Sequence, residues 1–356
     1  MLMENAEMTP QRKSLARPAA ALLSLLLALT AVPLPVRAGS LSSTVLGYFP
    51  KNLGEFGYAD LKSARQAAWF SQFQSQVLPP QFRMFTQFLS NAGVDPNTQV
   101  DEIAWGAVNN PAPSTNAAPG ATASTDDAPQ IVGEQIVGIA TGNFTPSATD
   151  QYFAKQQMPR ITVRGYTLYA FGAGVSPTDL CFMYFDPNTA AFGHRALLEK
   201  MIAVRFGDED SFLANTTLFP LVNELNGEST IWAAMDQSYT HLGIGQFLPE
   251  AEQFPGADAL LGRVKSMTVS ADADSGLDIK VTPVCGSASD ALTLAQLLQA
   301  GLLFKRYQQA QSNPDMARVI DNTTVSADGD RLKIETQLSD DLLRALLNRG
   351  AFNVRM

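Results

Sequence analysis

The sequence is poor in the side chains that enzymes most often use for metal binding and for acid–base catalysis. It has 2 cysteines and 2 histidines in 356 residues. Two cysteines exclude a disulfide-dense scaffold and a zinc site made of four cysteines. The two histidines, His194 and His241, leave little material for general acid–base chemistry. Because no familiar nucleophile, metal, dinucleotide or phosphate motif occurs either, we assign no catalytic, cofactor-binding or metal-binding residue.

Basic charge is also scarce. Lysine and arginine number 25 against 34 aspartates and glutamates, which gives a net charge of −9. This balance argues against sequence-independent binding of nucleic acid, which needs basic side chains to displace phosphate counterions. Apolar residues make up 46% of the chain and charged residues 17%, so the chain can bury a substantial core. The composition is that of a globular protein with one large domain or two smaller ones.

The first 38 residues have the pattern of an export signal. Residues 12–17 read RKSLAR, residues 18–36 carry no charge, and residues 19–32 form a dense apolar stretch. Val36 and Ala38 then suit the −3 and −1 positions of a cleavage site before Gly39. We therefore expect a cleaved signal peptide at 1–38 and a periplasmic or extracellular mature chain. In the alternative reading the segment stays uncleaved and anchors the protein in a membrane.

The mature chain shows a partial internal duplication. Residues 100–170 and 264–338 both read as strand, strand, helix, strand, strand. Alternating apolar residues mark the strands, and turn residues at Arg164-Gly165 and Asp328-Gly329 mark the last hairpin of each unit. We therefore divide the mature chain into an N-terminal half at 39–257, a C-terminal half at 258–350 and a tail at 351–356.

The predicted fold class is α+β, with antiparallel sheets covered by helices on one face and built from two related ββαββ-containing halves. The halves could form separate domains or share one sheet. In the C-terminal half, a helix over 286–311 carries a predicted buried stripe of Leu294, Leu297, Leu298 and Leu302. A final helix begins at Ser339, and its predicted buried stripe consists of Leu342, Leu343, Leu346 and Leu347.

Four segments of the N-terminal half carry further expectations. Residues 44–49, TVLGYF, read as a short strand, and residues 109–130 read as a flexible surface loop that joins two paired strands. Residues 61–78 and 81–93 read as two helices that crowd aromatic side chains together. This aromatic region is read as core rather than as an apolar groove for a peptide or lipid. Its aromatic members are Trp69, Phe70, Phe73, Phe82, Phe85 and Phe88.

Cys181 and Cys285 allow two interpretations. In an oxidising compartment they could form one disulfide between the halves, but both lie in apolar strand contexts and could equally be two buried thiols. Together with His194 and His241 they have the residue types of a zinc site, but the four lack close ligand spacing. Each histidine is read as a surface or capping residue.

Two acidic clusters have structural readings. Asp208, Glu209 and Asp210 precede Ser211 and are expected to supply the N-terminal charge of a helix. Asp272, Asp274 and Asp278 surround Gly276 and look like part of a calcium loop. Pro283 occupies the position where such a loop needs a glutamate, so we predict the tip of a hairpin instead.

The chain resembles a class of secreted bacterial proteins of unknown function from acidobacteria and planctomycetes, which carry repeated strand–strand–helix units. The resemblance rests on the predicted signal peptide, the strand pair VDEIAWGAV and EQIVGIATGNF, and the pattern over 264–347. It covers most of 44–347 but includes no sharp motif. The resemblance implies a location in the cell envelope and a non-enzymatic role, and it carries over no site residue.

These observations favour an exported, non-enzymatic protein that acts through protein interaction or as a structural component. Its partner would be an envelope or extracellular protein, and it would contact a membrane only if the N-terminal segment stays uncleaved. The alternative is a periplasmic small-ligand-binding protein or enzyme whose site is assembled from residues distant in the sequence. A pocket with converging titratable groups would favour that alternative.

Overall fold

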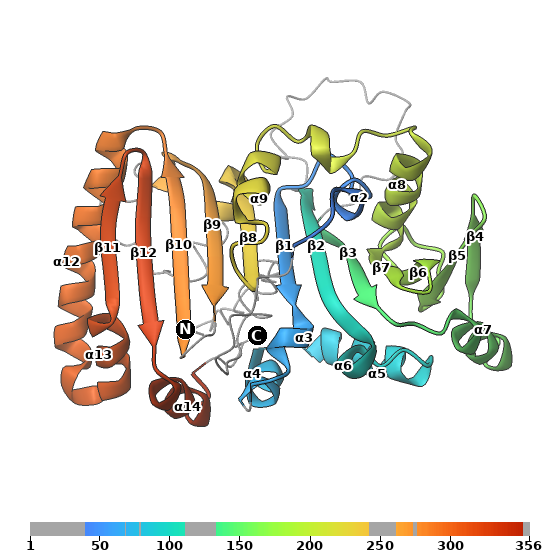
Figure 1. The fold of residues 1–356 in the computed structure, drawn as a ribbon, viewed down its shortest axis with the longest axis horizontal. Helices are drawn as coiled ribbons and strands as arrows, with labels where there is room; N and C mark the ends of the chain where they lie inside the picture. Colours follow the sequence, from blue (N-terminus) through green and yellow to red (C-terminus); the bar gives the residue numbers. More distant parts are fainter. Residues whose placement is uncertain are drawn as a thin grey trace, which may run out of the picture.

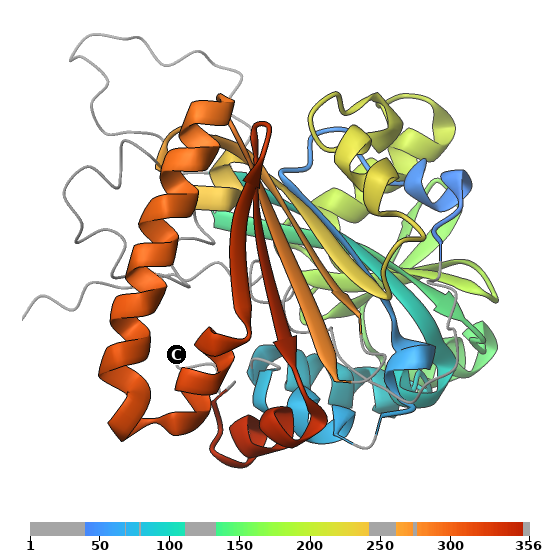
Figure 2. The same ribbon diagram turned by 60° about the vertical axis from the view of Figure 1, so that its left-hand side comes forward.

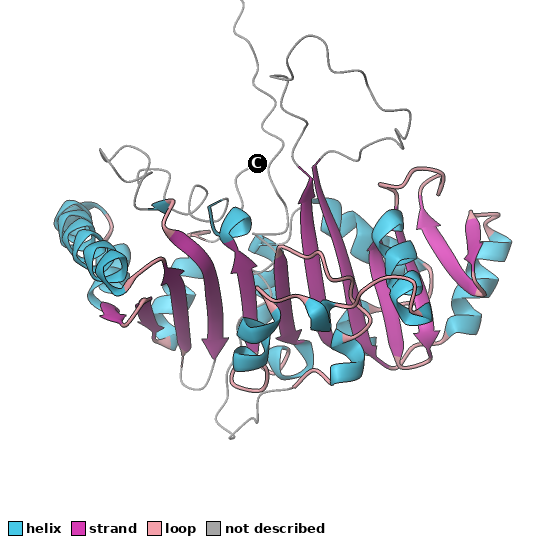
Figure 3. Cartoon of the chain, turned by 90° about the horizontal axis from the view of Figure 1, so that it is seen from above, coloured by secondary structure: helices cyan, strands magenta, loops and turns pink. Residues whose placement is uncertain are grey.

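Twelve strands form one continuous antiparallel sheet that runs through the whole molecule (Figure 1). The computed structural model describes residues 40–67, 69–77, 80–110, 133–241, 261–272 and 276–351. Seen from above, the strands form a single curved layer (Figure 3). The strand order is β11-β12-β10-β9-β8-β1-β2-β3-β7-β6-β5-β4. The two predicted halves therefore share one sheet, and the boundary proposed between residues 257 and 258 lies outside the described residues.

The strand bounds agree with most of the alternating patterns in the sequence. The strands are β1 (Glu55–Asp60), β2 (Val100–Asn110), β3 (Gly133–Gly142), β4 (Arg160–Val163), β5 (Tyr166–Phe171), β6 (Leu180–Asp186), β7 (Thr189–His194), β8 (Ile231–Asp236), β9 (Val264–Asp272), β10 (Leu277–Cys285), β11 (Thr323–Asp328) and β12 (Arg331–Leu338). Residues 111–132, which include most of the expected surface loop, lie outside the description.

The sheet is organised outward from the central pair β8 and β1. On one side the order is β9, β10, β12, β11, and on the other it is β2, β3, β7, β6, β5, β4. When the β6–β7 hairpin is set aside, the two orders correspond element by element. The two halves therefore match in strand order, and β6–β7 is the extra hairpin of the first half.

The helices differ in number and length between the two halves. The described helices are α2 (Ser43–Leu46), α3 (Leu61–Ala64), α4 (Phe70–Val77), α5 (Pro80–Asn91), α6 (Pro96–Gln99), α7 (Pro146–Lys155), α8 (Arg195–Phe206), the 3-10 helix η1 (Phe212–Ala214), α9 (Phe219–Leu225), α12 (Ala288–Ser312), α13 (Pro314–Asp321) and α14 (Asp340–Asn348).

The α+β class is confirmed, and the N-terminal half adds a second layer of helices. Trp105 packs into a cluster with α4, α7 and α14, whereas its neighbour Ala104 packs into a cluster with α8 and α9 on the other face. Successive strand residues point to opposite faces, so β2 contributes to both clusters. In the C-terminal half, α12 packs over β11 and β12 (Figure 2). That half follows the predicted one-sided arrangement.

Three local expectations in the N-terminal half need correction. Residues 44–49 do not form a strand: Ser43–Leu46 is the short helix α2, because the Ser42 side chain accepts a hydrogen bond from the Val45 N–H and caps it. The first strand begins only at Glu55. The expected helix over 61–78 is divided into α3 and α4. Asp208 and Asp210 do not serve as helix-capping charges, because they pair with Arg164 and Lys51.

The predicted final helix is confirmed, but the stripe on α12 is only partly correct. Ser339 caps α14, and the stripe of Leu342, Leu343, Leu346 and Leu347 is at most 5% exposed. On α12, Leu294 is buried and Leu298 and Leu302 are partly buried against β11 and β12. Leu297 was predicted to be buried, but it is 42% exposed because it lies on the outer side of the helix.

Candidate functional site

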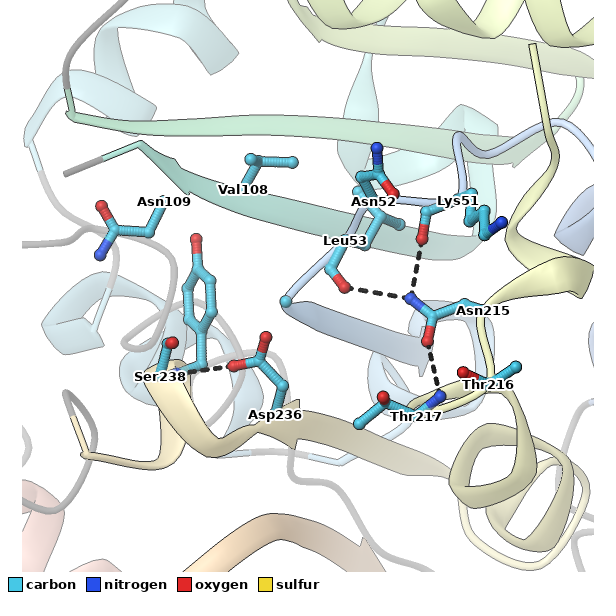
Figure 4. A pocket seen from close by; sticks show the side chains of 12 residues that line it. Lys51, Asn52, Leu53, Val108, Asn109, Asn215, Thr216, Thr217, Asp236 and Ser238 are labelled. Carbon is cyan, nitrogen blue, oxygen red and sulfur yellow. Dashed lines mark hydrogen bonds between the residues drawn. The ribbon is translucent and has the colours of Figure 1, made fainter. Parts of the chain in front are cut away.

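A polar pocket lies beside the beginning of β1, near the centre of the sheet (Figure 4). Its volume is about 380 Å³, and residues 51–54, 108–109, 215–217, 236 and 238–239 line it. These segments come from the entry to β1, the end of β2, the turn after η1 and the end of β8. The pocket is large enough for a small polar molecule. Whether it is a ligand site depends on whether its polar groups are free or already hydrogen-bonded within the protein.

Asn215 holds one wall of the pocket together. Its Nδ2 donates to the Lys51 carbonyl at 2.7 Å and to the Leu53 carbonyl at 3.2 Å, and its Oδ1 accepts from the backbone N–H groups of Thr217 and Leu218. The side chain therefore joins the entry of β1 to the start of α9, as the dashed lines in Figure 4 show in part. Its hydrogen-bonding atoms are used for this junction.

Asp236 and Tyr239 form the opposite wall. Asp236 Oδ1 accepts a hydrogen bond from the Tyr239 backbone N–H at 3.0 Å. Burial raises the pKa of Asp236, whereas its hydrogen bonds from the backbone of Tyr239 and Ser238 act in the opposite direction. Tyr239 is 1% exposed, and burial, followed by the charges of Glu134 and Glu55, raises the pKa of its phenol. The phenol is therefore protonated at neutral pH.

A buried polar pair lies next to this wall on β1 and β2. Trp105 Nε1 donates to Glu55 Oε1 at 3.0 Å, and both side chains are fully buried. Gly57 lies opposite Trp105 in the strand register and leaves space for the indole, since a Cβ there would be 2.2 Å from Trp105 Cζ2. The missing side chain at Gly57 allows the Glu55–Trp105 pair to form inside the sheet.

The pocket therefore has a structural explanation. Asn215 ties two loops together and Asp236 accepts from the turn that follows β8. At the rim, the Lys51 ammonium pairs with Asp210 at 3.0 Å, where both side chains are largely solvated. These contacts hold the pocket walls, and none of them sets a base against a nucleophile. No pattern in the sequence indicated this pocket, because its walls come from four distant segments.

The two cysteines are free, buried thiols in different parts of the sheet. Cys181 on β6 packs beneath α8, and Cys285 at the end of β10 packs beneath α12. Burial raises the pKa of the Cys181 thiol to about 11 and also raises the pKa of Cys285. The sequence left open either one disulfide or two buried thiols, and in the structure the two cysteines are buried thiols. Both are in their protonated, unreactive form at neutral pH.

The histidines occupy separate positions. Nδ1 of His194 accepts a hydrogen bond from the Ile136 N–H at 2.9 Å, and burial lowers the pKa of the ring. His194 takes the N-cap position of α8 but makes no side-chain cap bond there. His241 is exposed and lies 3.0 Å from the Leu261 carbonyl. Among the described residues, no group of three or more His, Cys, Asp or Glu side chains could hold a metal ion.

The remaining sequence candidates have structural roles where they can be described. Asp272 and Asp278 face each other in the β9–β10 hairpin, as predicted, while Asp274 lies outside the described residues. Asp272 accepts from Ser229 and from the Thr230 N–H. The core interpretation of the aromatic region is confirmed for Trp69, Phe70, Phe73 and Phe88, and the side chains of Phe82 and Phe85 are not described.

One surface cluster of aromatic rings surrounds Arg205 at the end of α8. Its guanidinium carbon lies 5.1 Å from the Tyr48 ring centre and 5.5 Å from that of Phe185. Its Nη1 donates a hydrogen bond to the Tyr48 hydroxyl at 2.7 Å. Tyr48 and Phe185 also stack on each other at 4.7 Å. Arginine and aromatic rings are typical of binding hot spots, but here they satisfy one another.

The outer face of α12 is the feature with no partner among the described residues. It exposes several large apolar side chains beside polar ones such as Thr293 and Gln296, whereas a surface helix normally presents a mainly polar outer face. Residues 291–304 contain no charged residue, and α12 is apolar on its inner side as well. We call the five exposed side chains the outer α12 face: Leu292 at 53% exposure, Leu297 at 42%, Leu303 at 70%, Phe304 at 63% and Tyr307 at 82%.

Sequence reasoning missed this surface, although a signal for it was present. The stripe that contacts the sheet accounts for only part of the apolar residues between Ala291 and Tyr307, and the others repeat at helical spacing on the opposite side. A helix that is apolar all round is normally buried on all sides. None of the described helices is long and apolar enough to cross a membrane.

Comparison with known proteins gives only distant structural likenesses. No protein-family model and no curated protein matches the chain. Crystal forms I, III and IV of TP0453 align over 88%, 86% and 85% of this chain and over 99%, 99% and 95% of that protein. The TM-scores are 0.44, 0.48 and 0.46, at 11–12% sequence identity. These values assign neither a family nor a function.

Proposed function

We propose that the chain is an exported, non-enzymatic protein of the periplasm or extracellular space that binds a protein partner through the outer α12 face. The observation that carries this proposal is the exposure of large apolar side chains along one side of a helix. Leu303, Phe304 and Tyr307 are 70%, 63% and 82% exposed. Exposed apolar patches larger than a few hundred Å² mark interaction sites in soluble proteins.

The exposed area is large enough for that role. An aromatic side chain buries roughly 150–250 Å², so Phe304 and Tyr307 alone expose on the order of 300 Å². With the three leucines, the outer α12 face reaches on the order of 600 Å², which approaches the ~800 Å² that each partner buries in a standard interface. The polar pocket is the weaker basis for a function, because Asn215 and Asp236 are already used to hold its walls.

The export part of the proposal is supported by the sequence pattern of residues 1–38 and is compatible with the contacts of the segment that follows the expected cleavage site. Leu41 is buried, and Asn226 accepts from its N–H at 2.8 Å and donates to its carbonyl at 3.0 Å. Removal of residues 1–38 would leave this anchored segment and every described residue in place. We expect N-terminal sequencing of the protein from the periplasm or the medium to begin at Gly39. A chain that keeps residues 1–38 in the cytosolic fraction would contradict export.

The interaction part can be tested by photocrosslinking in the exporting cell. With p-benzoylphenylalanine in place of Leu303, we expect a defined protein adduct, because a partner bound on the outer α12 face would bring its C–H bonds within reach of the benzophenone. The matched control carries the same residue at Val175, which is 78% exposed but lies in the loop before β6. The proposal would be contradicted if the protein with the probe at position 303 formed no protein adduct, or formed the same adducts as the protein with the probe at position 175.

A further inference from the structure

We infer that the partner of the outer α12 face is a second copy of this chain, bound through an antiparallel α12–α12 contact whose two-fold axis passes near Ala300. This inference rests on the proposed function and names its partner. Figure 2 shows α12 along the outside of the molecule, packed against β11 and β12 at one end of the sheet. The helix has 25 residues, which is long enough for a helix pair of several turns.

The spacing of the outer residues is that of a helix–helix seam. Leu297, Ala300, Phe304 and Tyr307 follow one another in alternating steps of three and four residues. This repeat keeps one line of side chains facing a second helix along their shared length, as in coiled coils. The residues that pack on the sheet, such as Leu294 and Leu298, occupy the opposite side of the helix. The helix can therefore bind the sheet and a partner helix at once.

The seam is also self-complementary about Ala300. A two-fold contact places each residue against the one equally far on the other side of its centre. Leu297 and Leu303 lie three residues from Ala300 on either side, so each leucine would pack on the leucine of the other copy. Seven residues from the centre, the Tyr307 ring would meet Thr293, where its hydroxyl has a hydrogen-bonding partner. Phe304, four residues from the centre, would meet Gln296, so the leucine contacts lie nearest the axis and contacts between an aromatic ring and a polar side chain lie further out.

Small residues at the centre permit a close approach of the two helices. Ala300 is exposed, and a Cβ on the adjacent Gly301 would meet no atom within 4 Å. Glycine inside a helix costs about 1 kcal/mol relative to alanine. Among the described residues no contact accounts for Gly301, which flanks Ala300 and adds no side chain beside the proposed crossing point.

Charge favours a second protein copy over a lipid surface. Helices that lie on membranes carry basic residues along their polar face and bind anionic lipids. Here the only basic residues in α12 are Lys305 and Arg306, and Arg306 is already paired with Asp321 at 2.8 Å. The whole chain is acidic, at −9, which opposes binding to an anionic surface.

The first test measures the association state of the purified chain. We expect sedimentation velocity to show a reversible dimer at micromolar concentrations. The paired substitutions Leu303→Gln and Phe304→Gln should raise the dissociation constant by at least about tenfold, because they place polar groups in the centre of the contact. The matched control Val175→Gln should leave it unchanged. Circular dichroism must show that all three proteins are folded alike.

The second test measures the geometry by disulfide crosslinking. Cys181 and Cys285 are buried and do not compete for the reaction. Ala300→Cys lies on the axis and should give a crosslinked dimer on mild oxidation. Gln311→Cys lies about 16 Å from the axis along the helix, so two copies of it should not react with each other. A mixture of Gln311→Cys and Ser289→Cys chains should crosslink, since these positions oppose each other in the antiparallel pair.

Each outcome decides between the inference and the broader proposal. A chain that is monomeric at all concentrations, or a Gln311→Cys chain that crosslinks to itself, would overturn the antiparallel self-contact. If the photocrosslink from Leu303 reaches a different protein while the purified chain stays monomeric, the inference fails and the proposed function stands. Flotation of the wild-type chain with vesicles of anionic phospholipid, lost on the Leu303 and Phe304 substitutions, would overturn both.

Discussion

Replacing Asn215 with alanine is expected to lower the free energy of unfolding by about 3 kcal/mol, because one side chain closes two loops at once. Its amide donates to the carbonyls of Lys51 and Leu53 and accepts from the N–H groups of Thr217 and Leu218. Alanine would leave partly buried backbone groups on both sides of the junction without their partner. The measurement is urea denaturation of the purified chain, followed by tryptophan fluorescence.

The control for this prediction is the neighbouring Thr216→Ala. Thr216 is exposed and lines the same pocket, so its replacement should change the unfolding free energy by less than about 0.5 kcal/mol. Asn215→Asp provides a second comparison, since it keeps the acceptor for Thr217 but turns a charged oxygen towards two carbonyls. An Asn215→Ala protein as stable as the Thr216→Ala protein would show that the pocket wall does not depend on this side chain.

The same residue shows why the pocket could not be predicted from the sequence. Asn215 joins the entry of β1 to the turn after η1, segments more than 150 residues apart. A single sequence shows the periodicity of a strand or helix, but it does not show which loops meet when the strands pair. Strands and hairpins could be predicted because the alternation of apolar residues and the turn residues are local signals in the sequence. The pairing of β1 with β8, which builds the centre of the sheet, has no local signal.

The errors in the sequence-based predictions have local physical causes. Residues 44–49 are rich in strand-forming side chains, but capping by Ser42 makes the first of them a helical turn. Leu297 fits the periodic stripe of α12 equally well as an inner or an outer residue, because leucines occur all around the helix. Periodicity identifies a buried face only where the opposite face is polar. On α12 it is not, and that same ambiguity is the signal for an interaction surface.

A second large effect on stability is expected at the centre of the sheet, where Gly57→Ala should cost about 3 kcal/mol or more. A Cβ at this position would lie 2.2 Å from Trp105 Cζ2 and 2.4 Å from Cε2. The indole cannot move aside easily, because it is fully buried and its Nε1 donates to Glu55. The substitution therefore forces the β1 and β2 backbones apart or breaks the buried hydrogen bond.

A double-mutant cycle isolates this close approach. Trp105→Phe removes the indole atoms that a Cβ on Gly57 would strike, so Gly57→Ala should cost at least about 2 kcal/mol less in that background. The loss of the bond to Glu55 affects both proteins that carry Trp105→Phe equally and cancels. Gly106→Ala is the matched control: its Cβ would meet the Leu53 Cδ1 methyl at 2.4 Å, and a flexible leucine end can rotate away. If Gly57→Ala costs the same with tryptophan or phenylalanine at position 105, the indole is not what requires glycine there.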